Sequence, residues 1–269
     1  MILLNGRDCR ESLAGDRALA YGDGVFETLA VVDGSPLCLE KHLERMRRGC
    51  EALMIESGGV SEFENDLKAL AFDDLNVLKL AITRGAGGRG YRPSQSSLPN
   101  RLTSTHPWPY RSLPLPDRAW ICEHRISRNQ ALAGIKHCNR LDQIMASSEW
   151  PGDDYLEGIM LDDQDRIIEG TRSNLFLKAG NEVVTPDLCE SGVAGIVREL
   201  IIDQLKDWQI PCVVGDISAA DLHAAEEFFI CNSILGVRSI SMIGETFTFD
   251  STTLCLELDG ALRGARYIA

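Results

Sequence analysis

Lys136 lies in a segment whose composition suits a chemically active lysine. It directly follows five small or apolar residues, 131–135, and precedes a stretch that we predict to be helical. A lysine acts as a nucleophile only after desolvation or a nearby cation has lowered its pKa, because the ammonium form has no lone pair. The segment therefore allows a nucleophilic lysine. The alternative is a surface lysine whose stem lies along apolar neighbours.

Glu169 is a second candidate for chemistry. It follows the apolar pair Ile167 and Ile168 and opens a polar run, 170–174, between two predicted strands. A carboxylate at the end of a strand can face the nitrogen of a pyridine ring and keep that nitrogen protonated, so that the ring withdraws electrons. The alternative is an ordinary glutamate in a turn.

Three further features could hold a small anion such as a phosphate. Gly195 begins a predicted helix with Ile196 and Val197, and the first N–H groups of a helix are free to bind an anion. Asn232 and Ser233 follow an apolar strand, although such a pair is also common in hydrogen-bonded turns. Arg45 lies between apolar positions of a predicted helix with no acidic residue three or four positions away. It could clamp a phosphate bidentately or remain a solvated surface arginine.

Composition limits the classes of ligand. The formal net charge is −13, with 27 Lys and Arg against 40 Asp and Glu. Because nucleic-acid binding depends on a basic surface, this balance disfavours a nucleic-acid partner. The nine cysteines and five histidines show no metal-binding spacing, so we predict no metal. We find neither a signal peptide nor an apolar run long enough for a membrane span, and we expect a cytoplasmic protein that does not bind a membrane.

The elements that must position these residues divide the chain into two predicted domains, an N-terminal α+β domain (1–112) and a C-terminal α/β domain (118–269). The first contains a hairpin turning at 33–34, helices around 43–53 and 63–70, and a strand at 76–83. Periodicity is lost between 94 and 117, where prolines cluster, so we predict a surface connection with a linker at 113–117. The second contains helices near 139–150, 195–208 and 253–263 and strands at 119–122, 158–161, 166–168, 174–177, 182–185, 212–214 and 227–231.

Taken in order, these segments resemble the fold-type IV enzymes, which use pyridoxal 5′-phosphate (PLP). This group contains branched-chain and D-amino-acid aminotransferases and 4-amino-4-deoxychorismate lyase. The resemblance rests on 16–18 with 21–28, 42–45, 134–136 with Asn139, 169–174, 195–198 and 231–233. It implies a two-domain α+β fold with the cofactor in the cleft between the domains, and a homodimer.

The resemblance also implies a role for each candidate residue. Lys136 holds PLP as a Schiff base, and Glu169 faces the pyridine nitrogen. The implied cofactor-binding set is Arg45, Lys136, Glu169, Ser173, Asn174, Gly195, Ile196, Val197, Asn232 and Ser233. Val197 stands where several members of the group have threonine, so only its backbone N–H can contact the phosphate.

Within the group, the glycine-rich run 84–91 and the segment 132–141 are similar to the lyase. This similarity implies cleavage of aminodeoxychorismate to 4-aminobenzoate and pyruvate, a step of folate biosynthesis, with Lys136 as the proton carrier. The substrate has two carboxylates, and we expect Arg89 and Tyr91, ahead of Arg84, to bind one of them; Thr28 is expected to face the cofactor. The alternative function is a D-amino-acid or branched-chain aminotransferase of the same fold.

Overall fold

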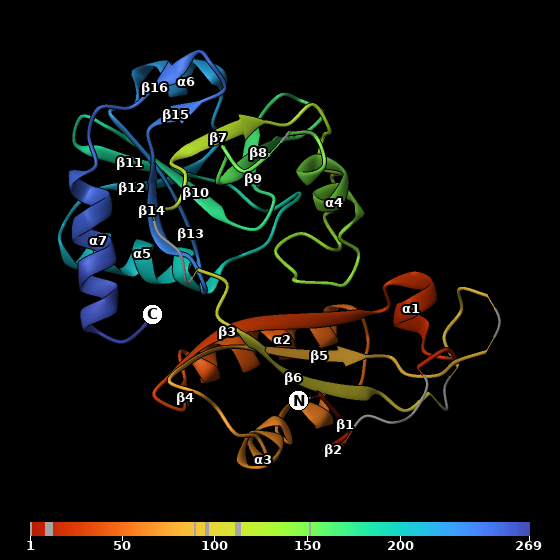
Figure 1. Cartoon of the computed structure of the whole chain (residues 1–269). Helices are drawn as coiled ribbons and strands as arrows, with labels where there is room; N and C mark the ends of the chain where they lie inside the picture. Colours follow the sequence, from red (N-terminus) through yellow and green to blue (C-terminus); the bar gives the residue numbers. More distant parts are fainter. Residues whose placement is uncertain (1, 9–12, 89, 95–96, 111–113, 151) are drawn as a thin grey trace. The chain divides into compact units, whose positions relative to one another are not determined.

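The computed structural model of the chain describes residues 2–8, 13–88, 90–94, 97–110, 114–150 and 152–269. The chain forms two units (Figure 1). The first comprises Met1–Pro109 with Ile135–Asn139, and the second comprises Tyr110–Gly134 with Arg140–Ala269. The linker expected at 113–117 stays a prediction, because residue 113 lies outside the described residues. No helix in the described ranges is long and apolar enough to cross a membrane.

The first unit is built on an antiparallel sheet whose strands follow the order β2-β1-β6-β5-β3-β4. The strands are β1 (Ile2–Leu4), β2 (Arg7–Asp8), β3 (Gly24–Val32), β4 (Ser35–Pro36), β5 (Leu75–Thr83) and β6 (Asn100–Pro107). The helices are α1 (Arg17–Tyr21), α2 (Leu39–Ala52) and α3 (Phe63–Lys68), with a 3-10 turn at Gly58–Val60. The predicted hairpin at 33–34 and the strand at 76–83 are confirmed as β3–β4 and β5.

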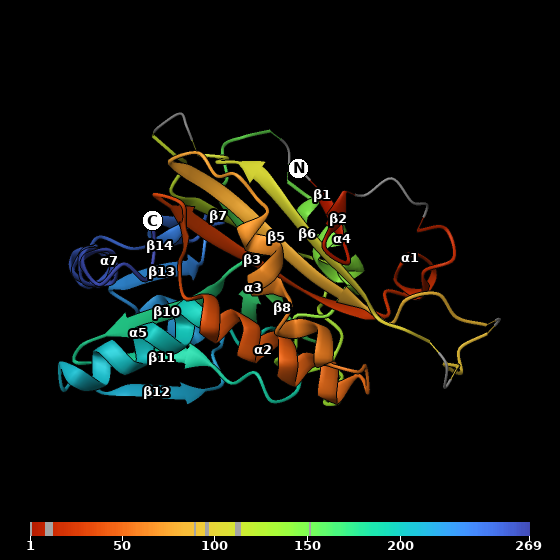
Figure 2. The same cartoon turned by 90° about the horizontal axis from the view of Figure 1, so that it is seen from below.

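One face of this sheet carries the core of the unit. On β5, Leu78, Leu80 and Ile82 are buried, whereas Lys79 is exposed, which is the alternation expected of a sheet with one covered face. Leu43, Met46 and Cys50 form one buried stripe of α2, and this helix packs across β3 (Figure 2). The predicted helical periodicity around 43–53 is therefore confirmed.

The surface connection predicted over 94–117 is wrong for its central part, because 100–107 form β6. This strand pairs with β1 on one side and with β5 on the other. Its sequence lacks apolar alternation, and its one buried residue is the polar Thr103, so periodicity gives no signal. Pro99 precedes the strand and Pro107 is its last residue, a position where a missing N–H costs little.

The second unit contains two sheets, with strand orders β12-β11-β10-β13-β14 and β16-β15-β7-β8-β9. The strands are β7 (Arg118–Ile121), β8 (Glu157–Leu161), β9 (Ile167–Gly170), β10 (Asn174–Ala179), β11 (Glu182–Pro186), β12 (Cys212–Gly215), β13 (Glu227–Asn232), β14 (Gly236–Ile240), β15 (Met242–Ile243) and β16 (Phe247–Thr248). The helices are α4 (Leu141–Ser147), α5 (Ile196–Asp207), α6 (Ala219–Ala224) and α7 (Thr253–Gly264). The predicted helices and strands of this part of the chain are thus present.

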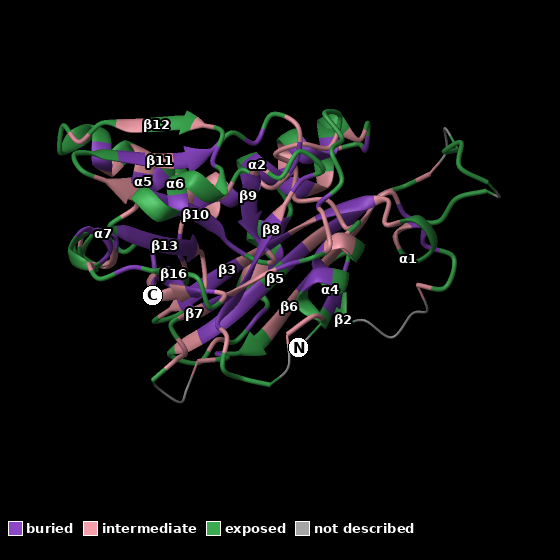
Figure 3. Ribbon diagram, turned by 90° about the horizontal axis from the view of Figure 1, so that it is seen from above, coloured by how far each residue is buried: buried purple, intermediate pink, exposed green. Residues whose placement is uncertain are grey.

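The core of the second unit combines side chains of both sheets, among them Ile159 and Ile167 from one and Leu175 and Phe228 from the other. The helices α5 and α7 pack on β13 and β14, and both β10 and β13 are largely buried (Figure 3). Glu169 lies within β9, which continues to Gly170, rather than opening the turn as expected. Strand geometry therefore fixes the backbone of Glu169.

Replacing Leu78 with alanine tests the core of the first unit. We expect Leu78→Ala to lower the free energy of unfolding by about 2–5 kcal/mol, because it leaves a cavity in a fully buried site. Lys79→Ala is the matched control on the exposed face of the same strand, with an expected change within about 0.5 kcal/mol. Urea denaturation measures both, and equal effects would contradict this assignment of the two faces.

Candidate active site

Glu27, His42 and Arg45 form a buried polar cluster in the first unit. The Arg45 Nε donates to Glu27 Oε1 at 2.8 Å, and a second guanidinium nitrogen of Arg45 donates to Oε2 at 2.5 Å. The His42 Nδ1 lies 2.6 Å from Oε2 of the same carboxylate. All three residues are at least nine-tenths buried. Arg45, expected from its helical neighbours to have no acidic partner, is therefore paired with a glutamate on β3.

The titration of this cluster follows from its burial. Burial alone would raise the pKa of Glu27, but the charge and hydrogen bonds of Arg45, with the hydrogen bond from His42, lower it to about 2. Burial lowers the pKa of His42 below its ordinary value, and the charges of Arg45 and Lys136 act in the same direction against the opposing effect of Glu27. A neutral His42 whose Nδ1–H donates to Glu27 is consistent with the lowered pKa of Glu27 and with the lowered pKa of His42.

Lys136 is held against β3 in the same unit. The backbone N–H of Phe26 donates to the Lys136 carbonyl at 3.0 Å, and the N–H of Cys138 donates to the Gly24 carbonyl at 2.9 Å. The Lys136 Nζ lies 4.6 Å from the centre of the Phe26 ring. The Lys136 side chain is half-buried. Its backbone is anchored on both sides, which limits where the amine can reach.

Glu169 is the corresponding buried group of the second unit. Its side chain is 4% exposed. The Gln143 Nε2 donates to Oε1 at 3.3 Å, and the backbone N–H of Val193 donates to Oε2 at 2.8 Å. Both oxygens of the Glu169 carboxyl group therefore accept a hydrogen bond from a neutral donor.

The segment that supplies the Val193 N–H continues into the start of α5. The Asn174 Nδ2 donates to the Val193 carbonyl at 2.8 Å. A Cβ on Gly195 would lie 1.9 Å from the Asn174 Oδ1, so any larger residue would have to displace the Asn174 side chain. Gly195 is extended and caps α5, and the first N–H groups of the helix, including those of Ile196 and Val197, have no acceptor within it. Asn174 and the helix start are thereby fixed together as an anion-binding geometry.

The remaining polar candidates of this unit bind protein groups. The Ser173 hydroxyl donates to Glu157 Oε2 at 2.7 Å, and Thr171 donates to Oε1 at 2.5 Å. The Asn232 Oδ1 accepts from the N–H groups of Ile234 and Leu235, while its Nδ2 donates to the Arg172 carbonyl. Glu157, which sequence reasoning missed, thus closes the turn after β9. Ser233, beside Asn232, is half-buried.

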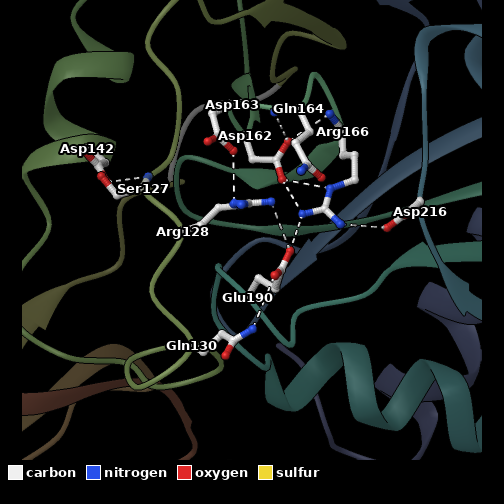
Figure 4. A network of polar contacts seen from close by, with 10 residues as sticks. All are labelled: Ser127, Arg128, Gln130, Asp142, Asp162, Asp163, Gln164, Arg166, Glu190 and Asp216. Carbon is white, nitrogen blue, oxygen red and sulfur yellow. Dashed lines mark hydrogen bonds and ion pairs between the residues drawn. The ribbon is translucent and has the colours of Figure 1, made fainter.

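A charge network steadies the loop that carries Val193 (Figure 4). The Glu190 carboxylate receives Arg166 at 2.6 Å and Arg128 at 3.4 Å, and the buried Asp162 receives Arg166 at 2.6 Å. The Glu190 carbonyl accepts from the Asn129 N–H at 2.8 Å. Farther along, the N–H of Gly134 donates to the Gly192 carbonyl, which joins the segment before Lys136 to the loop before α5.

The substrate candidates of the first unit have different surroundings. Arg89 lies outside the described residues. Tyr91 is highly exposed and contacts the Tyr21 ring edge to face, and its carbonyl accepts from the buried Arg17. Arg84 binds Asp23 and two backbone carbonyls, so its donors serve the protein. Thr28 is half-buried on β3.

The sequence motifs include Arg17, Glu27 and His42 but assign them no role of their own. Gln143 and Glu157 are not singled out from the sequence at all. The one signal available for Glu27 was its place in an apolar strand, where a charged residue requires a buried partner. The others lie in segments whose local pattern predicts an exposed polar residue. Only the tertiary structure brings their partners close.

Glu27→Gln tests the buried cluster. At pH 7 we expect a loss of about 3–5 kcal/mol in the free energy of unfolding, because Arg45 stays buried without its counter-charge. The pKa of Glu27 is lowered from 4.5 to about 2, so its stabilisation is complete above pH 4.5 and is lost as the pH falls towards 2. The gap between wild type and variant should therefore narrow over that range.

Glu44→Gln is the control, because Glu44 is an exposed residue of α2 that pairs with Arg47. We expect a change of at most about 1 kcal/mol. Urea titrations at several pH values measure all three proteins. A gap between wild type and Glu27→Gln that stays constant down to pH 2 would contradict the assigned titration.

Comparison with known proteins places this geometry in a family. Residues 24–243 match the family model for amino-transferase class IV. The chain is 34% identical over 247 residues to an aminodeoxychorismate lyase of Vibrio harveyi, with 90% of this chain and 91% of the relative covered. It is 30% identical over 240 residues to a putative branched-chain-amino-acid aminotransferase of Methanocaldococcus jannaschii, with 85% and 83% covered.

Among solved structures, the crystal structure of 4-amino-4-deoxychorismate lyase from Pseudomonas aeruginosa matches with a TM-score of 0.94 and 37% identity. The match covers 100% of both chains. The ordered motifs, the fold and these similarities agree from end to end. The chain therefore belongs to the amino-transferase class IV family, the fold-type IV group.

Proposed function

We propose that this chain is a PLP-dependent aminodeoxychorismate lyase, which releases 4-aminobenzoate and pyruvate in folate biosynthesis. The observation that carries the proposal is similarity to lyases over the full length, with 37% identity and a TM-score of 0.94 to the Pseudomonas aeruginosa enzyme. The glycine-rich run 84–91 and the segment around Lys136 support the same assignment.

The residues present fit PLP. The start of α5 with Gly195 and Asn174 has the geometry for a phosphate, and the buried Glu169 carboxylate suits a protonated ring nitrogen. Lys136 would hold the cofactor covalently. The proposed binding set also contains Arg45, Ser173, Ile196, Val197, Asn232 and Ser233. When bound, PLP supplies an electron sink for the carbon that loses its proton.

The protein's own part in the reaction is to move a proton. Once the substrate amine has replaced Lys136 on the cofactor, the freed and neutral Lys136 amine would take the proton from C4 of the substrate and return it to the enolpyruvyl carbon as the carbon–oxygen bond breaks. Phe26, whose N–H fixes the Lys136 carbonyl, keeps this amine within a limited volume. Glu169 opposes the positive charge of the ring nitrogen throughout, so no proton has to leave that site.

Substrate binding, assembly and location complete the proposal. Arg89 and Tyr91 bind one substrate carboxylate, and Thr28 faces the cofactor. Arg84 ranks below them, because its donors bind Asp23 and two backbone carbonyls. The resemblance to the fold-type IV group further supports a homodimer that acts in the cytoplasm.

A transaminase is the second candidate function. The 30% identity to a putative branched-chain-amino-acid aminotransferase supports it. Both functions require Lys136 and Glu169, so the residues described above do not separate them. Their products do.

Assay of 4-aminobenzoate from aminodeoxychorismate tests the proposal. The wild type and Lys79→Ala, which removes an exposed lysine of the same unit, should form the product. Lys136→Ala should be slower by about 100- to 10,000-fold, because it lacks the proton carrier, and should lose the visible absorbance of bound PLP. If the wild type forms no 4-aminobenzoate but transfers the amino group of D-alanine or leucine, the chain is a transaminase.

A further inference from the structure

Gln143 is a buried amide whose donor points at the proposed partner of the cofactor ring. It lies on α4 and is 9% exposed. Its Nε2 donates to Glu169 Oε1 at 3.3 Å, while the Val193 N–H donates to Oε2 at 2.8 Å. Because the two donors approach different oxygens, together they fix the rotation of the carboxylate group as well as its position.

The position of Gln143 is itself fixed by contacts around α4. Asp142 accepts from the Ser127 N–H at 2.9 Å (Figure 4) and from the His124 ring at 2.9 Å. After the helix, Glu149 accepts from the N–H groups of Glu123 and His124 at 2.6 and 2.7 Å. These four hydrogen bonds tie both ends of α4 to the segment 123–127.

Apolar packing holds the same helix against the sheet that contains the strand of Glu169. Ala146 of α4 lies in one buried cluster with Met160 of β8 and Ile168 of β9. Ile168 directly precedes Glu169. The helix therefore packs against β8, the strand that pairs with β9, and the Gln143 side chain has little freedom to turn away.

The side-chain oxygen of Gln143, Oε1, is unfavourable for the stability of the folded protein. Within the described residues, its buried Oε1 has no hydrogen-bond partner. Leaving an acceptor buried and unsatisfied costs free energy, and an apolar side chain of similar size would avoid that cost. An apolar residue would avoid that cost but would also remove one donor from the buried Glu169, so its two effects on stability oppose each other. Orientation of Glu169 requires the amide.

We propose that Gln143 is a positioning residue, which holds the Glu169 carboxylate in the orientation that meets the ring nitrogen of PLP. The inference rests on the proposed function in that it assumes PLP as the cofactor and Glu169 as the partner of its ring. It does not depend on whether the chain is a lyase or a transaminase. Gln143 touches neither substrate nor cofactor in this assignment and acts only through Glu169.

Gln143→Met tests this role, because it preserves length and helix propensity but removes the donor. We expect the dissociation constant of PLP, measured by titration of the apoprotein, to rise by about tenfold, and kcat to fall by about tenfold, since a hydrogen bond to a charged group is lost. The KM of the substrate and the melting temperature of the apoprotein should change little. The visible absorbance of bound PLP should change its pH dependence.

Ser148→Ala is the matched control. Ser148 is an exposed residue just after α4, and its hydroxyl donates to the Ile144 carbonyl one turn earlier. This variant should match the wild type in every readout. Gln143→Glu decides the matter if Gln143→Met does not fold. It keeps the shape, places a second carboxylate beside Glu169 and should weaken PLP binding more than Gln143→Met.

Wild-type PLP affinity and absorbance in a folded Gln143→Met, or in Gln143→Glu where Gln143→Met does not fold, would overturn the proposal. Failure of the proposed function is recognised separately. In that case the wild type forms no 4-aminobenzoate, yet the PLP titration still reports the effect of Gln143. If the wild-type apoprotein does not bind PLP at all, both the positioning role and the proposed function are refuted.

Discussion

Burial of carboxylates is the constraint on which both units depend. A charged carboxylate removed from water requires donors inside the protein, because burial without them costs several kcal/mol. The almost fully buried acids of the described residues are Asp16, Glu27, Asp66, Glu157, Asp162, Glu169 and Glu227. Most of them join elements that are distant in sequence, whereas Asp162 binds Gln164 and Arg166 within its own turn. Asp66 of α3, for example, receives Arg101 and Thr103 of β6, and Glu227 of β13 receives the first N–H groups of α7.

The kind of donor distinguishes the carboxylates that stabilise the fold from the one proposed to contact the cofactor. Glu27 receives a guanidinium and an imidazole, and Asp162 receives a guanidinium, so their charges are compensated by cations. Glu157 uses hydroxyl donors to close a turn. The Gln143 amide and the Val193 N–H, both neutral donors, approach different oxygens of Glu169 and so orient its carboxyl group. A carboxylate prepared in this way can pair with a cationic ring, which is why Glu169 is the centre of the proposed site in the second unit.

Elements with strong periodicity were predictable from the sequence, and their tertiary partners were not. The apolar stripe of α2 indicates a helix, and the alternation of β5 indicates a strand. The strand β6 has neither pattern, so its sequence predicts a connection. The motifs, in their order along the chain, indicate both the family and the candidate site residues. Arg45 illustrates the limit, because its acidic partner Glu27 lies on a strand, 18 residues away, beyond the reach of helical spacing. Gln143 gave no signal, since an isolated glutamine on a short helix is ordinarily exposed.

The central claim is that Lys136 holds the cofactor covalently. Borohydride reduction of the PLP-loaded protein, followed by proteolysis and mass spectrometry, tests it directly, because reduction makes the bond between lysine and cofactor permanent. The peptide containing Lys136 alone should carry the added mass of the reduced cofactor. Label on a different lysine, or no label in protein that has bound PLP, would contradict it.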